Sequence, residues 1–149
     1  EADVDLTAEN IAPDHMVAGH TFAMTATDGT ENVAVCQTCH EGVESFEWEA
    51  GEDYDGDGAV ETNQEEVAGL LELLSTVLQD AGVEVLDHHP YFTLPEDAGE
   101  DLKGAVYNLK FARDDAATTH NMLYTVSLLQ LSYERVTGEP VPNAALIVP

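Results

Sequence analysis

The residues of this sequence best suited to chemistry are the five from Cys36 to His40, which read Cys-Gln-Thr-Cys-His. Two thiols at this spacing can reach the two vinyl groups of a porphyrin, and the adjacent imidazole can bind the iron from the same side. These are the only cysteines in the chain, so no disulfide framework competes for them. The motif therefore predicts one covalently attached haem c on Cys36 and Cys39, with His40 as an iron ligand.

Two other interpretations of the cysteine pair are weaker. A thioredoxin-like redox pair needs a strand before it and a helix after it in a β-α-β unit, and the surrounding pattern is rich in helix instead. A structural zinc ion needs four ligands, and the chain offers no second cysteine pair. Haem attachment is the remaining interpretation.

The ligand opposite His40 decides between electron transfer and catalysis at an open iron. His20 precedes the motif by a loop long enough to fold back over the haem, and His120 opens a predicted helix. We expect bis-histidine coordination by one of these two, which leaves the other for a haem on a neighbouring subunit or on a further part of the chain. The other candidates, for which we favour packing or surface roles, are His15, His88, His89, Met16, Met24 and Met122.

A second cluster with chemical character follows the motif, where Asp53, Asp55 and Asp57 alternate and Gly58 comes next. This D-x-D-x-D-G order matches the first six positions of a calcium loop, in which the carboxylates converge on one cation. Later ligands would be the Ala59 carbonyl, Glu61 and Gln64. Gln64 stands at position 12, where a complete calcium loop has Glu. We therefore predict a structural calcium loop at the start of a helix. The alternative is a solvated acidic turn.

Charge narrows the range of partners. Thirty Asp and Glu residues face four Lys and Arg residues, which gives a formal charge of −26. Nucleic acid and anionic membrane surfaces are disfavoured as partners because both would repel the chain. The apolar content of 44% argues against disorder, and the acidity favours adaptation to high salt over a calcium-loaded surface. No apolar run is long enough to span a membrane.

The length and apolar content fit one domain over residues 1–149, mainly α, with little or no β. We expect a loop-rich, haem-binding segment at 1–50, an acidic calcium loop at 51–66, a helical part at 67–138 and a tail at 139–149. Apolar spacing predicts about three long helices, at 65–81, 97–113 and about 119–136. The last two should pack antiparallel.

Two segments are predicted to be irregular. Residues 83–96 contain Pro90 and Pro95 around Tyr91 and Phe92, which indicates a packed connector rather than a strand, with its aromatic side chains covering the core. The apolar tail at 144–148 is short, so it is either an edge strand or an arm that docks on a neighbouring molecule.

The order of these motifs resembles the C-terminal region of extracellular multihaem c-type cytochromes over roughly residues 15–137. The similar elements are His20-Thr21-Phe22, Cys36 to His40, Asp55-Gly56-Asp57-Gly58, Glu66-Val67-x-x-Leu70-Leu71, Ala105-Val106-Tyr107-Asn108 and His120-Asn121-x-x-Tyr124. The last two are also similar to the end of the pentahaem ammonia-forming nitrite reductase group. The resemblance implies that His120, and also His20, binds haem. Those proteins carry several haems in each chain, and the nitrite reductases also need a lysine-ligated haem. This chain has one attachment motif, so we do not expect it to reduce nitrite as they do.

Three functions follow from these expectations. The first is electron transfer through a bis-histidine haem, as a module of a multi-subunit or filamentous extracellular assembly in which copies of the chain or redox partner proteins bring haems together. The second is a soluble monohaem shuttle, and the third is a haem enzyme that reduces a small nitrogen or sulfur compound. Covalent haem attachment places the chain in the periplasm, on the cell surface or outside the cell. Residue 1 is Glu rather than Met, so we expect a processed product or a piece of a longer chain.

Overall fold

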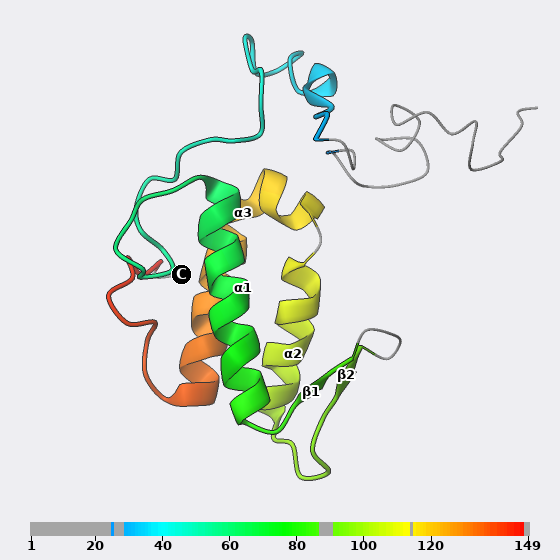
Figure 1. The fold of residues 1–149 in the computed structure, drawn as a ribbon, viewed down its shortest axis with the longest axis vertical. Helices are drawn as coiled ribbons and strands as arrows, with labels where there is room; N and C mark the ends of the chain where they lie inside the picture. The colour runs from blue at the N-terminus through cyan, green and yellow to red at the C-terminus, as the bar shows by residue number, and fades with distance from the viewer. Residues whose placement is uncertain (1–24, 26–28, 87–90, 114, 148–149) are drawn as a thin grey trace, which may run out of the picture. The chain divides into compact units, whose positions relative to one another are not determined.

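The computed structural model describes residues 25, 29–86, 91–113 and 115–147 (Figure 1). Within them the fold is mainly α, as the sequence predicts. The chain divides into an N-terminal unit, residues 1–46, and a C-terminal unit, residues 47–149. The elements are η2 (Val33–Val35), α1 (Asn63–Asp80), β1 (Glu84–Val85), β2 (Phe92–Thr93), α2 (Glu100–Ala112) and α3 (Asp115–Thr137).

Helix α1 begins two residues before the predicted start because Thr62 caps it. The Thr62 hydroxyl accepts a hydrogen bond from the Glu65 N–H, and the Glu65 carboxylate accepts one from the Thr62 N–H. This reciprocal capping box satisfies two N–H groups that would otherwise lack partners within the helix. The predicted apolar stripe is buried, at Val67, Leu70, Leu74 and Leu78, and it forms one side of the core.

The second and third helices differ from the prediction at their junction. Asp115 was expected to help end the second helix, but it is the first residue of α3. An acidic residue suits this position because the N-terminus of a helix carries a partial positive charge. Asn121 has non-helical dihedral angles and interrupts α3, close to the predicted start near residue 119. Helices α2 and α3 run antiparallel, as expected (Figure 1).

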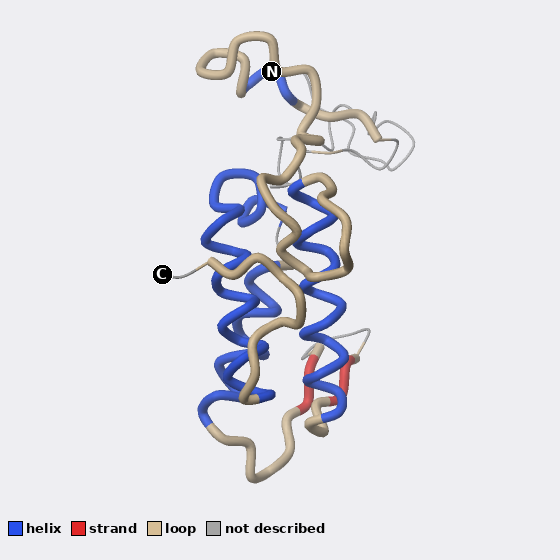
Figure 2. The backbone as a smooth tube through the Cα atoms, turned by 90° about the vertical axis from the view of Figure 1, so that its left-hand side faces the viewer, coloured by secondary structure: helices blue, strands red, loops and turns tan. Residues whose placement is uncertain are grey.

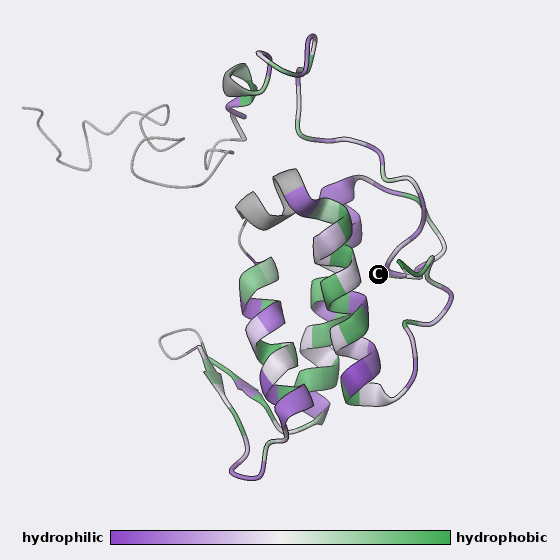
Figure 3. Ribbon diagram, turned by 180° about the vertical axis from the view of Figure 1, so that it is seen from behind, coloured by the Kyte–Doolittle hydropathy of each residue, from purple (hydrophilic) through white to green (hydrophobic). Residues whose placement is uncertain are grey.

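The core of the C-terminal unit lies between the three long helices. Leu109 of α2 and Val126 and Leu129 of α3 are fully buried with the apolar side of α1. Figure 3 shows apolar residues, in green, interspersed with polar ones along the helices. At roughly 1.5–3 kcal/mol for each large apolar side chain that leaves water, this shared core is the main stabilising contribution in the unit.

The expectation of a connector without strands at 83–96 is wrong. Glu84 pairs with Thr93, and Val85 pairs with Phe92, in a two-residue antiparallel hairpin. Strands this short show no alternation in sequence, so periodicity gives no signal for them. Of the two aromatic side chains expected to cover the core, Phe92 is buried and Tyr91 is exposed.

The tail is not an edge strand in the residues described, which extend to Ile147; docking on a neighbouring molecule stays a prediction. The tail packs on the core of its own unit, where Val141 is buried. The Ala145 N–H donates to the Asp53 carbonyl over 2.7 Å. The buried Gln130 side chain donates to the Ala145 carbonyl and accepts from the Ile147 N–H, at 2.9 and 3.0 Å. Figure 2 shows the tail running beside the helices.

Candidate haem and metal sites

The C-x-x-C-H motif forms a single helical turn directly after η2. The Cys36 N–H donates to the Val33 carbonyl over 2.9 Å. The Cys39 and His40 N–H groups both donate to the Cys36 carbonyl, over 3.0 and 2.8 Å. Residues three and four apart on a helical turn lie on one face. The two thiols and the imidazole therefore belong to the same face of this turn.

The chemical state of the motif is compatible with attachment to a porphyrin. Both cysteines are free thiols, Cys36 half-buried and Cys39 exposed, and His40 is exposed. The Gln37 side chain donates to the Val43 carbonyl over 3.0 Å, so the turn is braced by the chain that follows it. A planar group can approach this face from solvent, and the donor set of two thiols and one imidazole is the one that haem c requires.

Most of the predicted distal ligands cannot be placed. His15, His20, His88, His89, Met16 and Met24 lie outside the described residues, and the side chain of His120 does as well. Met122 is half-buried and packs against the core of the C-terminal unit. The choice between His20 and His120 as the distal ligand stays a prediction.

The structure brings together three of the six predicted calcium ligands. Carboxylate oxygens of Asp53, Asp55 and Asp57 lie within 4.8 Å of one another. The loop wraps around these carboxylates, because Gly56 and Gly58 donate their N–H groups to Asp53, over 2.6 and 2.9 Å. Gly58 has a φ of 100°, in the left-handed region that glycine adopts without steric cost.

Glu61 lies outside this group of convergent carboxylates. Its N–H donates to Glu66 over 3.0 Å. Loss of solvent raises the pKa of the Glu61 carboxyl above its ordinary value, and the nearby carboxylates of Asp57 and Glu65 raise it further. The proposed contributions of the Ala59 carbonyl and Gln64 stay predictions.

Glu66 holds the acidic loop against α1, a role that the sequence did not reveal. Its side chain is fully buried. One carboxylate oxygen accepts hydrogen bonds from the N–H groups of Tyr54 and Asp55, at 2.7 and 3.2 Å, and the other accepts from Glu61. The only signal was an acidic residue two positions beyond the expected twelfth ligand. The Glu66 carboxylate thus holds together the beginning and the end of the acidic loop by accepting hydrogen bonds from its backbone N–H groups.

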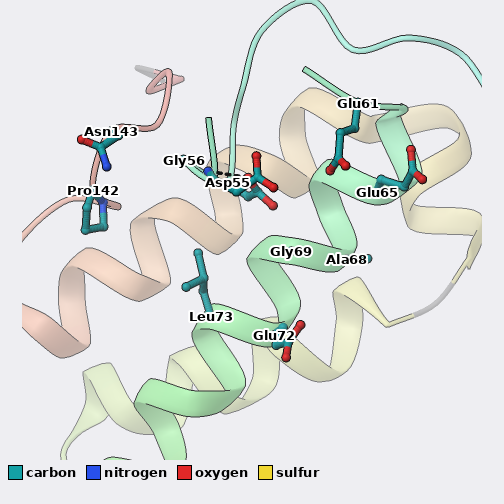
Figure 4. Close-up of a pocket in the computed structure, with 11 residues that line it drawn as sticks. Asp55, Gly56, Glu61, Glu65, Ala68, Gly69, Glu72, Leu73, Pro142 and Asn143 are labelled. Atoms are coloured by element: carbon teal, nitrogen blue, oxygen red, sulfur yellow. Dashed lines mark hydrogen bonds between the residues drawn. The ribbon is translucent and has the colours of Figure 1, made fainter. Parts of the chain in front are cut away.

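Gly69 is the second residue that sequence reasoning missed. A β-carbon at this position of α1 would lie 2.7 Å from the Asp55 carboxyl carbon and even closer to one of its oxygens. Glycine is therefore required for Asp55 to rest against the helix. Figure 4 shows Asp55 next to Gly69. The sequence signal would have been a glycine inside an otherwise strong helix, which usually has a packing reason.

Burial and nearby negative charges disfavour the ionised form of the Asp55 side chain relative to its protonated form. Desolvation raises the pKa of Asp55 above its ordinary value, and the neighbouring carboxylates of Asp57, Glu66 and Asp53 raise it further. The hydrogen bond from the Asp57 N–H, over 3.0 Å, acts in the opposite direction. A divalent cation between these carboxylates would relieve the repulsion.

An open cavity of 530 Å³ adjoins the loop (Figure 4). Five carboxylates line it together with the first turns of α1 and two residues of the tail; the lining residues are Asp55, Gly56, Asp57, Glu61, Glu65, Ala68, Gly69, Glu72, Leu73, Pro142 and Asn143. Such a surface favours cations and disfavours anionic ligands.

No family model, curated protein or solved structure matches the chain. Among the helices that the structure describes, none combines the length and the apolarity needed to cross a membrane.

Proposed function

We propose that this protein transfers electrons through one haem c bound covalently to Cys36 and Cys39, with His40 as the proximal iron ligand. The observation that carries the proposal is the single turn in which the Cys39 and His40 N–H groups share the Cys36 carbonyl, so that all three side chains belong to one face. Haem iron exchanges single electrons, and its axial ligands set its potential. The role of the chain is to fix the ligands and the attachment points.

The finer parts of the proposal follow from the histidines and the motif order. His20 or His120 is the distal ligand. The histidine left over binds a further haem, on a neighbouring subunit of a multi-subunit or filamentous extracellular assembly or on another part of the chain. The loop-rich N-terminal half binds the haem, and the helical part supports it. The order of motifs, similar to that of multihaem c-type cytochromes, supports this arrangement. Covalent attachment places the chain outside the cytoplasm, among redox partners or copies of itself.

The acidic loop is proposed to bind structural calcium through Asp53, Asp55 and Asp57. The convergence of three carboxylates within 4.8 Å supports this proposal. The pKa of Asp55 is raised first by burial and then by the neighbouring carboxylates, and a bound cation would offset the repulsion between them. Calcium prefers such oxygen ligands. Bound there, it would fix the loop that leads into α1.

Haem attachment can be tested by producing the full chain with a c-type haem maturation system. Mass spectrometry of the denatured protein should show the added mass of one haem. Cys36→Ala and Cys39→Ala should each remove one thioether bond, and the double variant should lose all covalent haem. Thr38→Ala in the same turn is the matched control and should keep it. A wild-type chain that never retains haem after denaturation would refute the proposal.

The electron-transfer role can be separated from catalysis by optical spectroscopy. A six-coordinate haem should give a low-spin spectrum that cyanide, carbon monoxide and nitrite leave unchanged. One of the variants His20→Ala and His120→Ala should open the iron to these ligands, whereas His88→Ala and His89→Ala should not. Ligand binding by the wild-type chain would favour the enzymatic alternative instead.

A further inference from the structure

Charge is distributed very unevenly along this chain. Residues 102–133, which cover most of α2 and α3, hold three Lys or Arg residues and two Asp residues, a formal charge of +1. The whole chain carries −26, so the other residues together carry −27. No acidic residue occurs from 116 to 133. Most of α2 and α3 is thus much less acidic than the rest of the sequence, so it repels another acidic body less.

The same surface exposes large apolar side chains, which we call the aromatic face: Tyr107 and Phe111 of α2, with Tyr124 and Leu131 of α3. Tyr107 is 71% exposed and Tyr124 is 59% exposed. Tyr107 and Phe111 lie about one turn apart on α2, and Tyr124 and Leu131 lie about two turns apart on α3, so each pair shares a helix face. The rings of Phe111 and Tyr124 meet edge to face, with centroids 6.5 Å apart. The aromatic face is therefore continuous across both helices.

The aromatic face has the composition of an interface core, with aromatic residues present and carboxylates absent. Its two neighbouring cations are already placed against aromatic rings of the hairpin. Lys110 lies 5.9 Å from the centroid of Tyr91, and Arg113 lies 5.2 Å from that of Phe92. Contact with an acidic surface would leave the exposed rings without an apolar counterpart. An apolar surface of low charge is the better complement.

We propose that the aromatic face binds the same face of a second copy of this chain, forming a two-fold symmetric dimer. The other exposed large apolar residues among those described lie mainly in loops and the hairpin, including Val60, Val85 and Leu146. Val60 is followed by Glu61 and Val85 is preceded by Glu84, so a second copy that approached either would meet a carboxylate beside the apolar side chain. Face-to-face pairing of α2 and α3 brings together stretches that carry a formal charge of +1 in each copy, rather than strongly acidic ones. This inference deepens the proposed assembly but does not depend on haem.

The test measures the mass of the full, haem-loaded chain by sedimentation velocity. The wild type should form dimers, and more tightly at about 1 M than at about 0.1 M salt, because salt screens the repulsion between the acidic remainders. Leu131→Glu should weaken the dimer at least about tenfold. Leu146→Glu is the matched control, with the same substitution, the same change in charge and similar exposure, 50% against 42%. It should leave the dimer unchanged.

Tyr107→Glu gives an independent test, because a side chain that is 71% exposed contributes little to the folded monomer. It should also produce monomers. A wild type that stays monomeric at high salt overturns the proposal. So does equal weakening by Leu131→Glu and Leu146→Glu, or growth beyond two copies as the concentration rises, which indicates a head-to-tail contact. Because the readout is mass, loss of the dimer and loss of haem are distinguishable.

Discussion

Replacing Gly69 by Ala should destabilise the C-terminal unit, against the preference of the helix itself. In the interior of an exposed helix this substitution stabilises by about 0.5–1 kcal/mol, since Ala has less backbone freedom to lose. At position 69, however, the new methyl group would overlap the Asp55 carboxylate. Asp55 is buried and is held by hydrogen bonds at both its N–H and its carboxylate, so it cannot move aside without loss.

The expected cost has two parts. Overpacking in a filled site costs about 1–3 kcal/mol, and the hydrogen bond from the Asp57 N–H to Asp55 contributes about 1 kcal/mol. Subtracting the gain in helix propensity leaves a net destabilisation of about 1–3 kcal/mol. For a chain of this size each kcal/mol changes the melting temperature by roughly 2–4 °C, so Gly69→Ala should lower it by several degrees.

The matched control is Gly104→Ala in α2, where a β-carbon would meet no atom within 4 Å. It should stabilise by about 0.5–1 kcal/mol and raise the melting temperature. Both variants are measured by thermal and urea denaturation followed by circular dichroism, with a chelator present. The reasoning is refuted if Gly69→Ala stabilises the protein as much as Gly104→Ala does, because Asp55 would then not rest against the helix.

Three further predictions concern the acidic loop. Glu66→Gln should lower the free energy of unfolding by about 2–4 kcal/mol in urea titrations, because it removes a buried carboxylate that accepts three backbone hydrogen bonds. The control is Glu65→Gln, in the neighbouring residue of the capping box, which should cost only about 1 kcal/mol. Calcium at 100 times its dissociation constant should stabilise the folded protein by about 2.7 kcal/mol, which raises the melting temperature by roughly 5–10 °C. In a thermal scan, Asp57→Asn should remove most of this shift. The absence of a shift in the wild type would contradict the calcium proposal. The folded-state pKa of Asp55 is raised above 3.8, so folding favours its protonated form, and without calcium its contribution to stability is lost as the pH rises from 3.8 through the raised pKa. Stability measured across this range should fall less for Asp55→Asn than for the wild type.

The helices could be predicted from the sequence because their signals are local. Apolar residues at helical spacing located α1, and Gly82 marked its end. The two-residue hairpin gave no periodic signal, and its pairing joins residues that the chain brings together only through a turn. The start of α3 at Asp115 was missed because an acidic residue suits the end of a loop and the first turn of a helix equally well in sequence.

For the candidate sites, the sequence determined which reactive side chains are present and how they are spaced. The spacing of Cys36, Cys39 and His40 is sufficient to predict a shared face, because three- and four-residue spacings coincide on any helical turn. The alternation of Asp53, Asp55 and Asp57 likewise predicts their convergence, which the structure confirms. Both arrangements are set by the local geometry of a few consecutive residues.

Only the tertiary structure decided what supports these residues. Glu66 binds the loop through N–H groups five to twelve residues earlier in the chain, Gly69 makes room for Asp55, and Gln130 holds the tail against the core. The aromatic face likewise exists only because α2 and α3 pack side by side. Contacts between residues far apart in sequence depend on the packed arrangement of whole helices, which spacing and composition do not specify.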